Sequence, residues 1–143
     1  MRFEEQIERI GQKLALARKK DDACQVFGAQ KHRYQTRPVN QRNLEDFEEK
    51  YGVAVPPDFR EFLLQIGTGA GPFYGIGEPR WGAGHLLSDP AVHLRVPSPL
   101  TPDMTEAEWA EMPLLSEEDF DDDRYELARS KTYCGILPFG DQG

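Results

Sequence analysis

Apolar residues near the N-terminus recur at a 3-4-3-4 spacing, which predicts a narrow seam along one helix of about four turns. The members of this seam are Phe3, Ile7, Ile10, Leu14 and Ala17. Cations at residues 18–20 suit the C-terminal end of the helix, where its dipole favours positive charge. We expect the seam to dock on the protein's own core, and docking on a partner helix is the alternative.

A second amphipathic helix is predicted over residues 43–52. Leu44, Phe47 and Tyr51 are spaced to share one face. Asn43 is the expected N-cap, because its side-chain oxygen can accept a hydrogen bond from the first turn. Gly52 supplies a left-handed residue that ends the helix.

A third helix is predicted to begin at Pro57, since proline suits the first helical position. An apolar stripe at i, i+3, i+4 and i+7 follows, and Gly67 stands where a C-terminal glycine belongs. The stripe consists of Phe59, Phe62, Leu63 and Ile66. We therefore predict that this helix and the one before it form a core module with facing aromatic stripes.

Shorter apolar runs predict strands. Phe73–Ile76 and Ile136–Phe139 are predicted as strands, and Cys24–Phe27 as a short strand entering the sheet. The polar stretch 30–42 is predicted to be a strand-like or irregular connector. The chain is thus expected to be an α+β protein, in which the N-terminal helix and the two-helix module pack on a mostly antiparallel sheet.

The chain changes character over residues 96–127, which carry four prolines and the acidic run 117–123. Thr105 and Glu108 have the spacing of a capping box for a short helix that holds Trp109. This stretch has too few apolar residues for a core of its own. We therefore predict a single domain over 1–143, with an acidic, proline-rich insertion at about 96–127.

The stretch LEDFEEKYGVAVPPDFREFLLQIGTGAG resembles the SMI1/KNR4 (SUKH) superfamily. The shared positions are Phe47-Glu48, Gly52, Pro57, Asp58-Phe59, Phe62-Leu63 and Gly67-Thr68-Gly69. The sequence CGILPFGDQG at 134–143 is also similar to a strand and turn of that family. Two positions depart from the family pattern: Ile66-Gly67 stands where Asn-Gly is common, and Val55-Pro56-Pro57 where Leu-Pro is common. The resemblance implies a Smi1/Knr4-like fold with further strands and a terminal helix, so we expect this chain to be truncated at its C-terminus relative to the family.

The chain carries a formal net charge of −8 and has a pI of about 4.9. That excess argues against duplex DNA and anionic membranes as partners. It is compatible with a basic protein partner, or with acidity that serves solubility alone. The basic stretch 31–42, with His32 and Tyr34, superficially resembles a nucleic-acid patch, but a solvated loop is the favoured interpretation. The chain has no signal-peptide pattern at Met1–Glu5 and no apolar run of membrane-spanning length, so we expect a cytoplasmic protein.

No catalytic, cofactor-binding or metal-binding residues are predicted. Cys24, Cys134 and the three histidines stand in no nucleophile or zinc-ligand spacing. The glycines at 67–71 follow a helix, whereas a dinucleotide-binding loop follows a strand. The acidic run lacks the glycine of a calcium loop. We expect a protein that is not an enzyme; a hydrolase using His85 or Cys134 would need these side chains to converge in one cleft.

The resemblance implies a protein-binding role, because family members include bacterial immunity proteins that neutralise toxins and eukaryotic regulators of cell-wall synthesis. The leading hypothesis is an immunity protein that binds a basic toxin domain, such as a nuclease or a deaminase; a regulatory scaffold of the Smi1/Knr4 type is the alternative. Candidate partner-binding residues are Tyr74, Trp81, Trp109, Glu117, Glu118, Asp119, Phe120, Asp121, Asp122 and Asp123. These aromatic residues are either exposed anchors or buried beside merely solvated acids, and the oligomeric state stays open.

Overall fold

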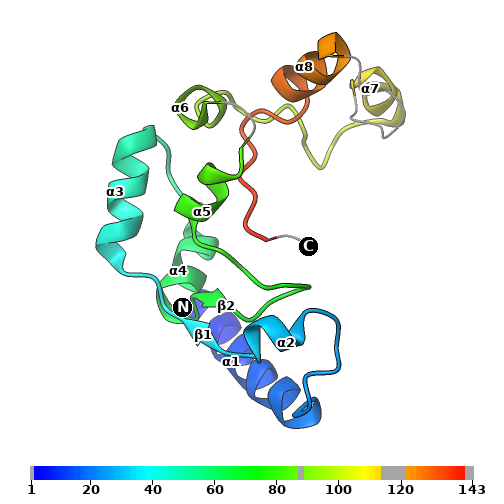
Figure 1. Cartoon of the computed structure of the whole chain (residues 1–143). Helices are drawn as coiled ribbons and strands as arrows, with labels where there is room; N and C mark the ends of the chain where they lie inside the picture. Colours follow the sequence, from blue (N-terminus) through cyan, green and yellow to red (C-terminus); the bar gives the residue numbers. More distant parts are fainter. Residues whose placement is uncertain (1, 87–88, 114–121, 141–143) are drawn as a thin grey trace. The chain divides into compact units, whose positions relative to one another are not determined.

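The protein is described by a computed structural model that covers residues 2–86, 89–113 and 122–140 (Figure 1). The chain forms two compact units, Met1–Leu86 with Pro138–Gly143, and Leu87–Leu137. The described residues are rich in helix and contain a small antiparallel sheet, which confirms the predicted α+β class. The single-domain organisation and the insertion at 96–127 stay predictions.

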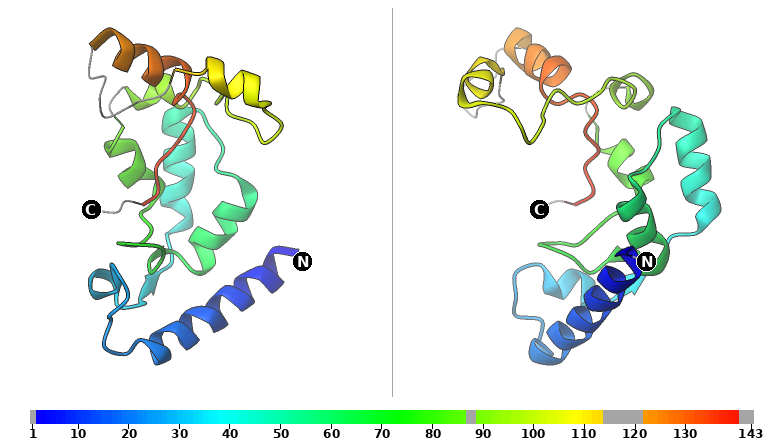
Figure 2. Two further views of the ribbon diagram at one scale, coloured as in Figure 1. Left: turned by 90° about the vertical axis from the view of Figure 1, so that its right-hand side faces the viewer. Right: turned by 180° about the vertical axis from the view of Figure 1, so that it is seen from behind.

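Helix α1 (Arg2–Lys20) runs without interruption from the first described residue (Figure 2). It packs on helix α4 (Pro57–Gln65), and Ile7 is its most buried seam residue. Gly11 lies against the same neighbour, since a Cβ built there would meet Ile66 Cδ1 at 4.0 Å. The seam therefore docks on the core of its own unit, as expected.

Helix α3 (Gln41–Tyr51) begins earlier than predicted. Asn40, not Asn43, is its N-cap, because the Asn40 side chain accepts a 2.8 Å hydrogen bond from the backbone N–H of Arg42. Gly52 ends the helix in the left-handed conformation, as predicted. Leu44 and Phe47 are buried, at 1% and 5% exposure.

Helix α4 has Pro57 at its first position, as predicted, and Leu63 is fully buried at 0% exposure. Gly67 follows with a φ of 92°, and a Cβ there would lie 1.8 Å from the Arg37 carbonyl oxygen, so the position requires glycine. The two helices α3 and α4 are predicted to face each other, but each packs mainly on another helix. Helix α4 packs on α1, while α3 packs on α5 (Pro79–Gly84).

The sheet consists of β1 (Thr36–Arg37) and β2 (Thr68–Gly69), which pair antiparallel with Thr36 opposite Gly69. Ile76 adds one antiparallel bridge to Gly69. A short helix, α2 (Ala29–His32), precedes β1.

All three predicted strands are wrong. The Cys24–Phe27 and Phe73–Ile76 segments form loops and turns, because Cys24 and Phe73 have a φ of 53° and Gly75 a φ of 105°, which interrupts an extended backbone. The Ile136–Phe139 segment has no ladder, although the Phe139 carbonyl accepts a hydrogen bond from Gly77 N–H.

The second unit contains α6 (Pro90–His93), α7 (Glu106–Glu111) and α8 (Asp122–Lys131). The predicted capping box of Thr105 and Glu108 is present at the start of α7. Thr132 and Cys134 are buried, and the Thr132 hydroxyl donates to the Pro113 carbonyl. The buried His93 ring lies 3.0 Å from the Ile136 carbonyl oxygen through Nε2, which ties α6 to the end of this unit.

Candidate protein-interaction surfaces

The predicted partner-binding residues are divided between the two units. Tyr74 and Trp81 belong to the first unit, and Trp109 and Asp123 to the second. Asp122 begins α8. Five predicted residues lie outside the described part of the chain: Glu117, Glu118, Asp119, Phe120 and Asp121.

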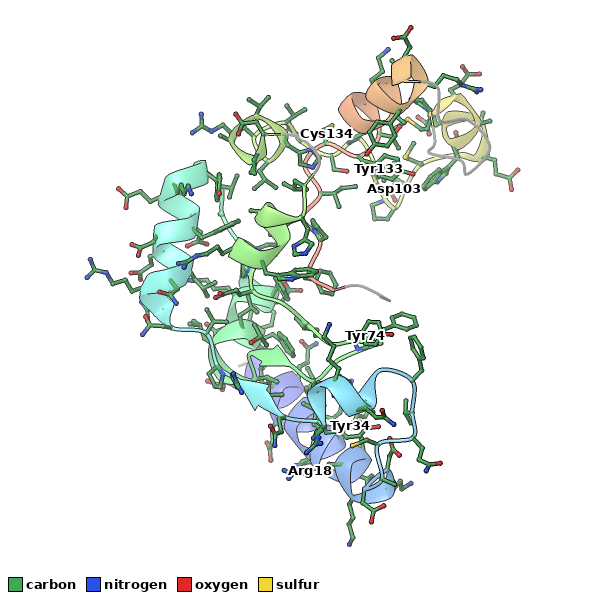
Figure 3. All side chains as sticks on the ribbon, viewed as in Figure 1. Arg18, Tyr34, Tyr74, Asp103, Tyr133 and Cys134 are labelled. Atoms are coloured by element: carbon green, nitrogen blue, oxygen red, sulfur yellow. The ribbon has the colours of Figure 1, made fainter. Side chains whose placement is uncertain are left out.

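Tyr74 belongs to an aromatic cluster that also contains Phe27, Phe73 and Lys31. The Phe27 ring lies 5.4 Å from the Tyr74 ring and 6.2 Å from the Phe73 ring, in an edge-on contact with the latter. The Lys31 ammonium sits 4.9 Å above the Tyr74 ring, in cation–π geometry. Phe27 and Phe73 are 61% and 48% exposed, so this aromatic cluster presents apolar surface to solvent. Tyr74 and the neighbouring Tyr34 and Arg18 lie around α2 (Figure 3).

Close backbone approach holds the aromatic cluster together. Gly28 has a φ of 82°, and a Cβ there would lie 1.8 Å from the Phe73 carbonyl oxygen. Only glycine allows the loop that carries Phe27 to approach the loop that carries Phe73 so closely. Gly75 does the same on the other side of Tyr74, where a Cβ would lie 1.9 Å from the Gly69 carbonyl oxygen.

Asp21 anchors the loop that leads to the aromatic cluster. Its carboxylate accepts the Tyr34 hydroxyl at 2.7 Å and the backbone N–H groups of Gln25 at 2.6 Å and Val26 at 3.1 Å. The hydrogen bond to Asp21 raises the pKa of Tyr34 to about 12, because it stabilises the protonated phenol. The same hydroxyl, followed by the Gln25 N–H, lowers the pKa of Asp21. The loop is thereby fixed while its Val26 and Phe27 side chains stay exposed.

A polar surface pocket of ≈ 680 Å³ lies on another side of α2. Gln30 and Arg33 reach it from α2 and its C-cap, and Arg18 reaches it from α1. Asp21 also lines the pocket but is already hydrogen-bonded by Tyr34. In the part of the chain that the structure describes, neither arginine forms an ion pair with a carboxylate. Asp22 lines the pocket as well, so two guanidinium groups and two carboxylates face it and their formal charges balance.

Trp81 is held within its own unit. Its ring lies 4.1 Å from the ring of His85, whose Nδ1 is 2.7 Å from the Trp81 carbonyl oxygen. The same indole covers Gly77, where a Cβ would approach the ring to 2.7 Å. Trp81 is half-buried by these contacts and stabilises the segment around α5.

Trp109 is 44% exposed on α7. The capping box fixes the start of this short helix, and the Thr105 backbone N–H lowers the pKa of Glu108 by donating to its carboxylate. Asp123 is exposed on α8. Of the three predicted aromatic anchors within the described residues, Trp109 presents the largest exposed fraction.

The candidate nucleophiles have structural partners. The buried Cys134 thiol donates to the carbonyls of Pro97 at 3.7 Å and Lys131 at 3.8 Å. Both cysteines are free. Among the described residues, no group of three histidine, cysteine or acidic side chains could hold a metal ion. None of the helices in the described ranges is both long and apolar enough to span a membrane.

The aromatic cluster contains residues that sequence reasoning missed, namely Phe27, Lys31 and Phe73. Phe27 ends the short run that is predicted to be a strand entering the sheet, and the signal against that prediction is Gly28, which follows it directly. A glycine after a short apolar run also marks a close turn, which is the structure observed.

Comparison with known proteins gives one match. The model of the SMI1 / KNR4 family (SUKH-1) matches residues 38–143. Helices α1 and α2 precede the matched range, as do Phe27 and Lys31 of the aromatic cluster, whereas Phe73 and Tyr74 lie within it. No curated protein and no solved structure matches the chain.

Proposed function

Because the chain belongs to the SMI1/KNR4 family (SUKH-1), we propose that it is a non-enzymatic, protein-binding module. More specifically, it is proposed to act in the cytoplasm as an immunity protein that binds and neutralises a bacterial toxin domain. The proposed partner is basic, as a nuclease or a nucleic-acid deaminase would be, because such enzymes bind polyanions.

The distribution of charge is the observation that carries this proposal. Residues 87–137, which form the second unit, contain twelve carboxylates and four lysines or arginines, so this unit alone holds the net charge of −8. The first unit contains thirteen of each sign and is formally neutral. A concentrated negative field steers a basic partner and raises its association rate by about tenfold to a thousandfold.

The second unit also offers an apolar anchor for such a partner. The exposed Trp109 indole lies on α7, which carries Glu106 and Glu111 as well. Tryptophan within a charged rim is the commonest kind of interface hot spot. We propose that Trp109 and the acidic run 117–123 form the toxin-binding surface, in which the acids orient the partner and the indole holds it.

A toxin challenge tests the proposal. Toxin domains encoded in neighbouring reading frames are sought first; each is then expressed with and without this chain, and growth is measured. Protection is expected from the wild type and reduced protection from Trp109→Ala. The triple variant Glu117→Lys, Glu118→Lys and Asp119→Lys is expected to lose protection.

A matched control separates a local effect from net charge. The variant Glu5→Lys, Asp46→Lys and Glu49→Lys makes the same change in charge on exposed residues of the first unit. It is expected to protect as well as the wild type. Equal loss in both triple variants would count against an acidic binding surface at 117–123.

A regulatory scaffold of the Smi1/Knr4 type is the second candidate, because the match is to the family as a whole. Such a scaffold would bind endogenous partners and give no protection in any toxin challenge. The same growth measurement therefore distinguishes the two functions.

A further inference from the structure

The N-terminal part of the first unit has the opposite charge to the second unit. Residues 18–37, here called the basic segment, contain six lysines or arginines and two aspartates, a formal excess of four positive charges. One of the two aspartates, Asp21, is occupied by the Tyr34 hydroxyl and two backbone N–H groups. The segment thus keeps a formal excess of positive charge with both aspartates counted.

The exposed rings of the aromatic cluster lie against this basic segment. Phe27 and Lys31 belong to it, and the 4.9 Å cation–π contact of Lys31 joins it to Tyr74. Val26 and Phe27 are 60% and 61% exposed although they are apolar. Arg18 and Arg33 line a pocket together with Asp21 and Asp22, and neither arginine forms an ion pair among the described residues. Exposed apolar side chains and the cations of the basic segment thus meet around one short helix.

The backbone beneath the aromatic cluster is held in an unfavourable conformation. Phe73 has a φ of 53°, which a bulky residue rarely adopts, yet its ring is about half exposed. Two glycines with left-handed backbones, Gly28 and Gly75, keep the surrounding loops in place. Strained residues of this kind persist where the surrounding structure holds them, and they concentrate at ligand-binding positions.

From these contacts we propose that the aromatic cluster and the basic segment form a second docking site, which binds an acidic segment of a partner protein through an aromatic or aliphatic anchor. The anchor lies against Phe27 and Phe73, and carboxylates on either side of it pair with Lys31, Arg33 and Arg18. This site is separate from the toxin-binding surface proposed above. It involves mostly residues that precede the matched range 38–143.

Charge favours a short acidic peptide over a nucleic acid. Outside the basic segment the chain holds eleven lysines or arginines and twenty-three carboxylates. A long polyanion would extend beyond the basic segment and be repelled by those carboxylates, whereas a short acidic peptide can be bound by the cations of the basic segment alone. Bulky apolar rings also suit a peptide side chain, which inserts between them.

Peptide titration tests the proposal with the whole chain. The probe is the synthetic heptapeptide Glu-Asp-Glu-Phe-Glu-Asp-Glu, labelled for fluorescence anisotropy and titrated at low and high salt. Saturable, salt-sensitive binding is expected, and an alanine in place of the peptide phenylalanine should weaken it by about fivefold or more. Failure to bind the probe would overturn this site without affecting the toxin challenge.

Matched variants identify the surface. Lys31→Glu with Arg33→Glu is expected to weaken peptide binding by about tenfold or more, and Phe73→Asn by a similar factor. Lys13→Glu with Arg42→Glu makes the same charge change on exposed residues elsewhere in the unit and should leave binding unchanged. Equal loss in both charge variants would overturn the proposal.

Two further measurements exclude other occupants. Oligothymidylate of similar length is expected to bind more weakly than the peptide, and tighter binding would assign the surface to nucleic acid instead. Sedimentation analysis is expected to show no self-association through this surface. Self-association through it would be salt-sensitive and would be removed by Lys31→Glu with Arg33→Glu. Such association would assign the surface to a second copy of the chain and overturn the proposal of a partner protein.

Discussion

The substitution Phe73→Gly is predicted to change the stability of the protein little, because relief of backbone strain offsets the lost burial of the ring. A residue with a Cβ in the left-handed region costs about 1–2 kcal/mol, which glycine relieves. Complete burial of a phenylalanine side chain contributes about 1.5–3 kcal/mol. Since Phe73 is 48% exposed, about half of that contribution is lost in the variant. The two terms oppose each other, so the free energy of unfolding should change by less than about 1 kcal/mol.

Phe47→Ala provides the contrast. Phe47 is only 5% exposed on α3, and removal of a buried phenylalanine ring costs about 3–5 kcal/mol. Phe73→Asn is a second variant at the strained position, because asparagine tolerates the left-handed region better than most residues. We expect it to behave as Phe73→Gly does.

Tryptophan fluorescence during urea unfolding is the assay. The two tryptophans, Trp81 and Trp109, lie in different units, so a Trp109→Phe background leaves an emission signal from the first unit alone. A loss of more than about 2 kcal/mol in Phe73→Gly would show that the ring belongs to the core. The exposed aromatic cluster would then be a structural feature, not a docking surface.

Three further predictions concern the first unit. Leu63→Ala should cost about 2–5 kcal/mol, and Leu16→Ala, at a residue 51% exposed, should cost less than about 0.5 kcal/mol, in the same urea assay. Gly67→Ala should destabilise strongly, because its Cβ would overlap the β1 carbonyl at 1.8 Å; a stable variant with an unchanged circular dichroism spectrum would contradict this. The Asp21–Tyr34 pair should contribute stability between its ordinary pKa values of about 4 and about 10. The contribution of the aspartate is lost as pH falls through its lowered pKa, and that of the tyrosine as pH rises through about 12. Tyr34→Phe should therefore raise the pKa of Asp21 toward its ordinary value in a carboxyl NMR titration, and an unchanged Asp21 titration would argue against the hydrogen bond.

The helices could be predicted because their signals are local. Helix α4 begins at Pro57 and is followed by a left-handed Gly67, and α7 begins with the capping box of Thr105 and Glu108, all of which are short-range patterns. The wrong cap at Asn43 shows the limit of such signals. Asn40 and Asn43 both have a side chain that can cap, and the backbone at Asn40, with a ψ of 133°, decides between them.

The strands could not be predicted because a strand needs a partner that the local pattern does not name. Three of the four residues at 24–27 are apolar, which favours a strand, yet Val26 and Phe27 lie exposed in a loop. The observed strands, β1 and β2, are instead two residues long and contain polar residues or glycine. Each is stabilised by antiparallel pairing with the other. Burial of aromatic residues has the same limit, since Trp81 is half-buried against Gly77 and Trp109 is exposed, and neither outcome is set by the neighbouring sequence.

The surfaces proposed for binding also depend on which residues the fold brings together, and not on local sequence patterns alone. Composition alone indicated an acidic protein, whereas the structure divides it into a neutral unit and an acidic unit. The sequence favours a solvated loop for the basic stretch 31–42, of which residues 31–37 belong to the basic segment. The contact between Phe27 and Phe73 joins residues far apart in the chain, so no local pattern could predict it.

Calorimetric titration of this chain into the toxin domain from which it protects cells in the growth challenge tests the central claim most directly. Equimolar, high-affinity binding is predicted that weakens steeply as salt is raised, and that is lost when residues 117–119 are changed to lysine. An absence of heat, or binding of the same affinity by that triple variant, would contradict the claim that this SMI1/KNR4 protein neutralises a toxin through its acidic unit.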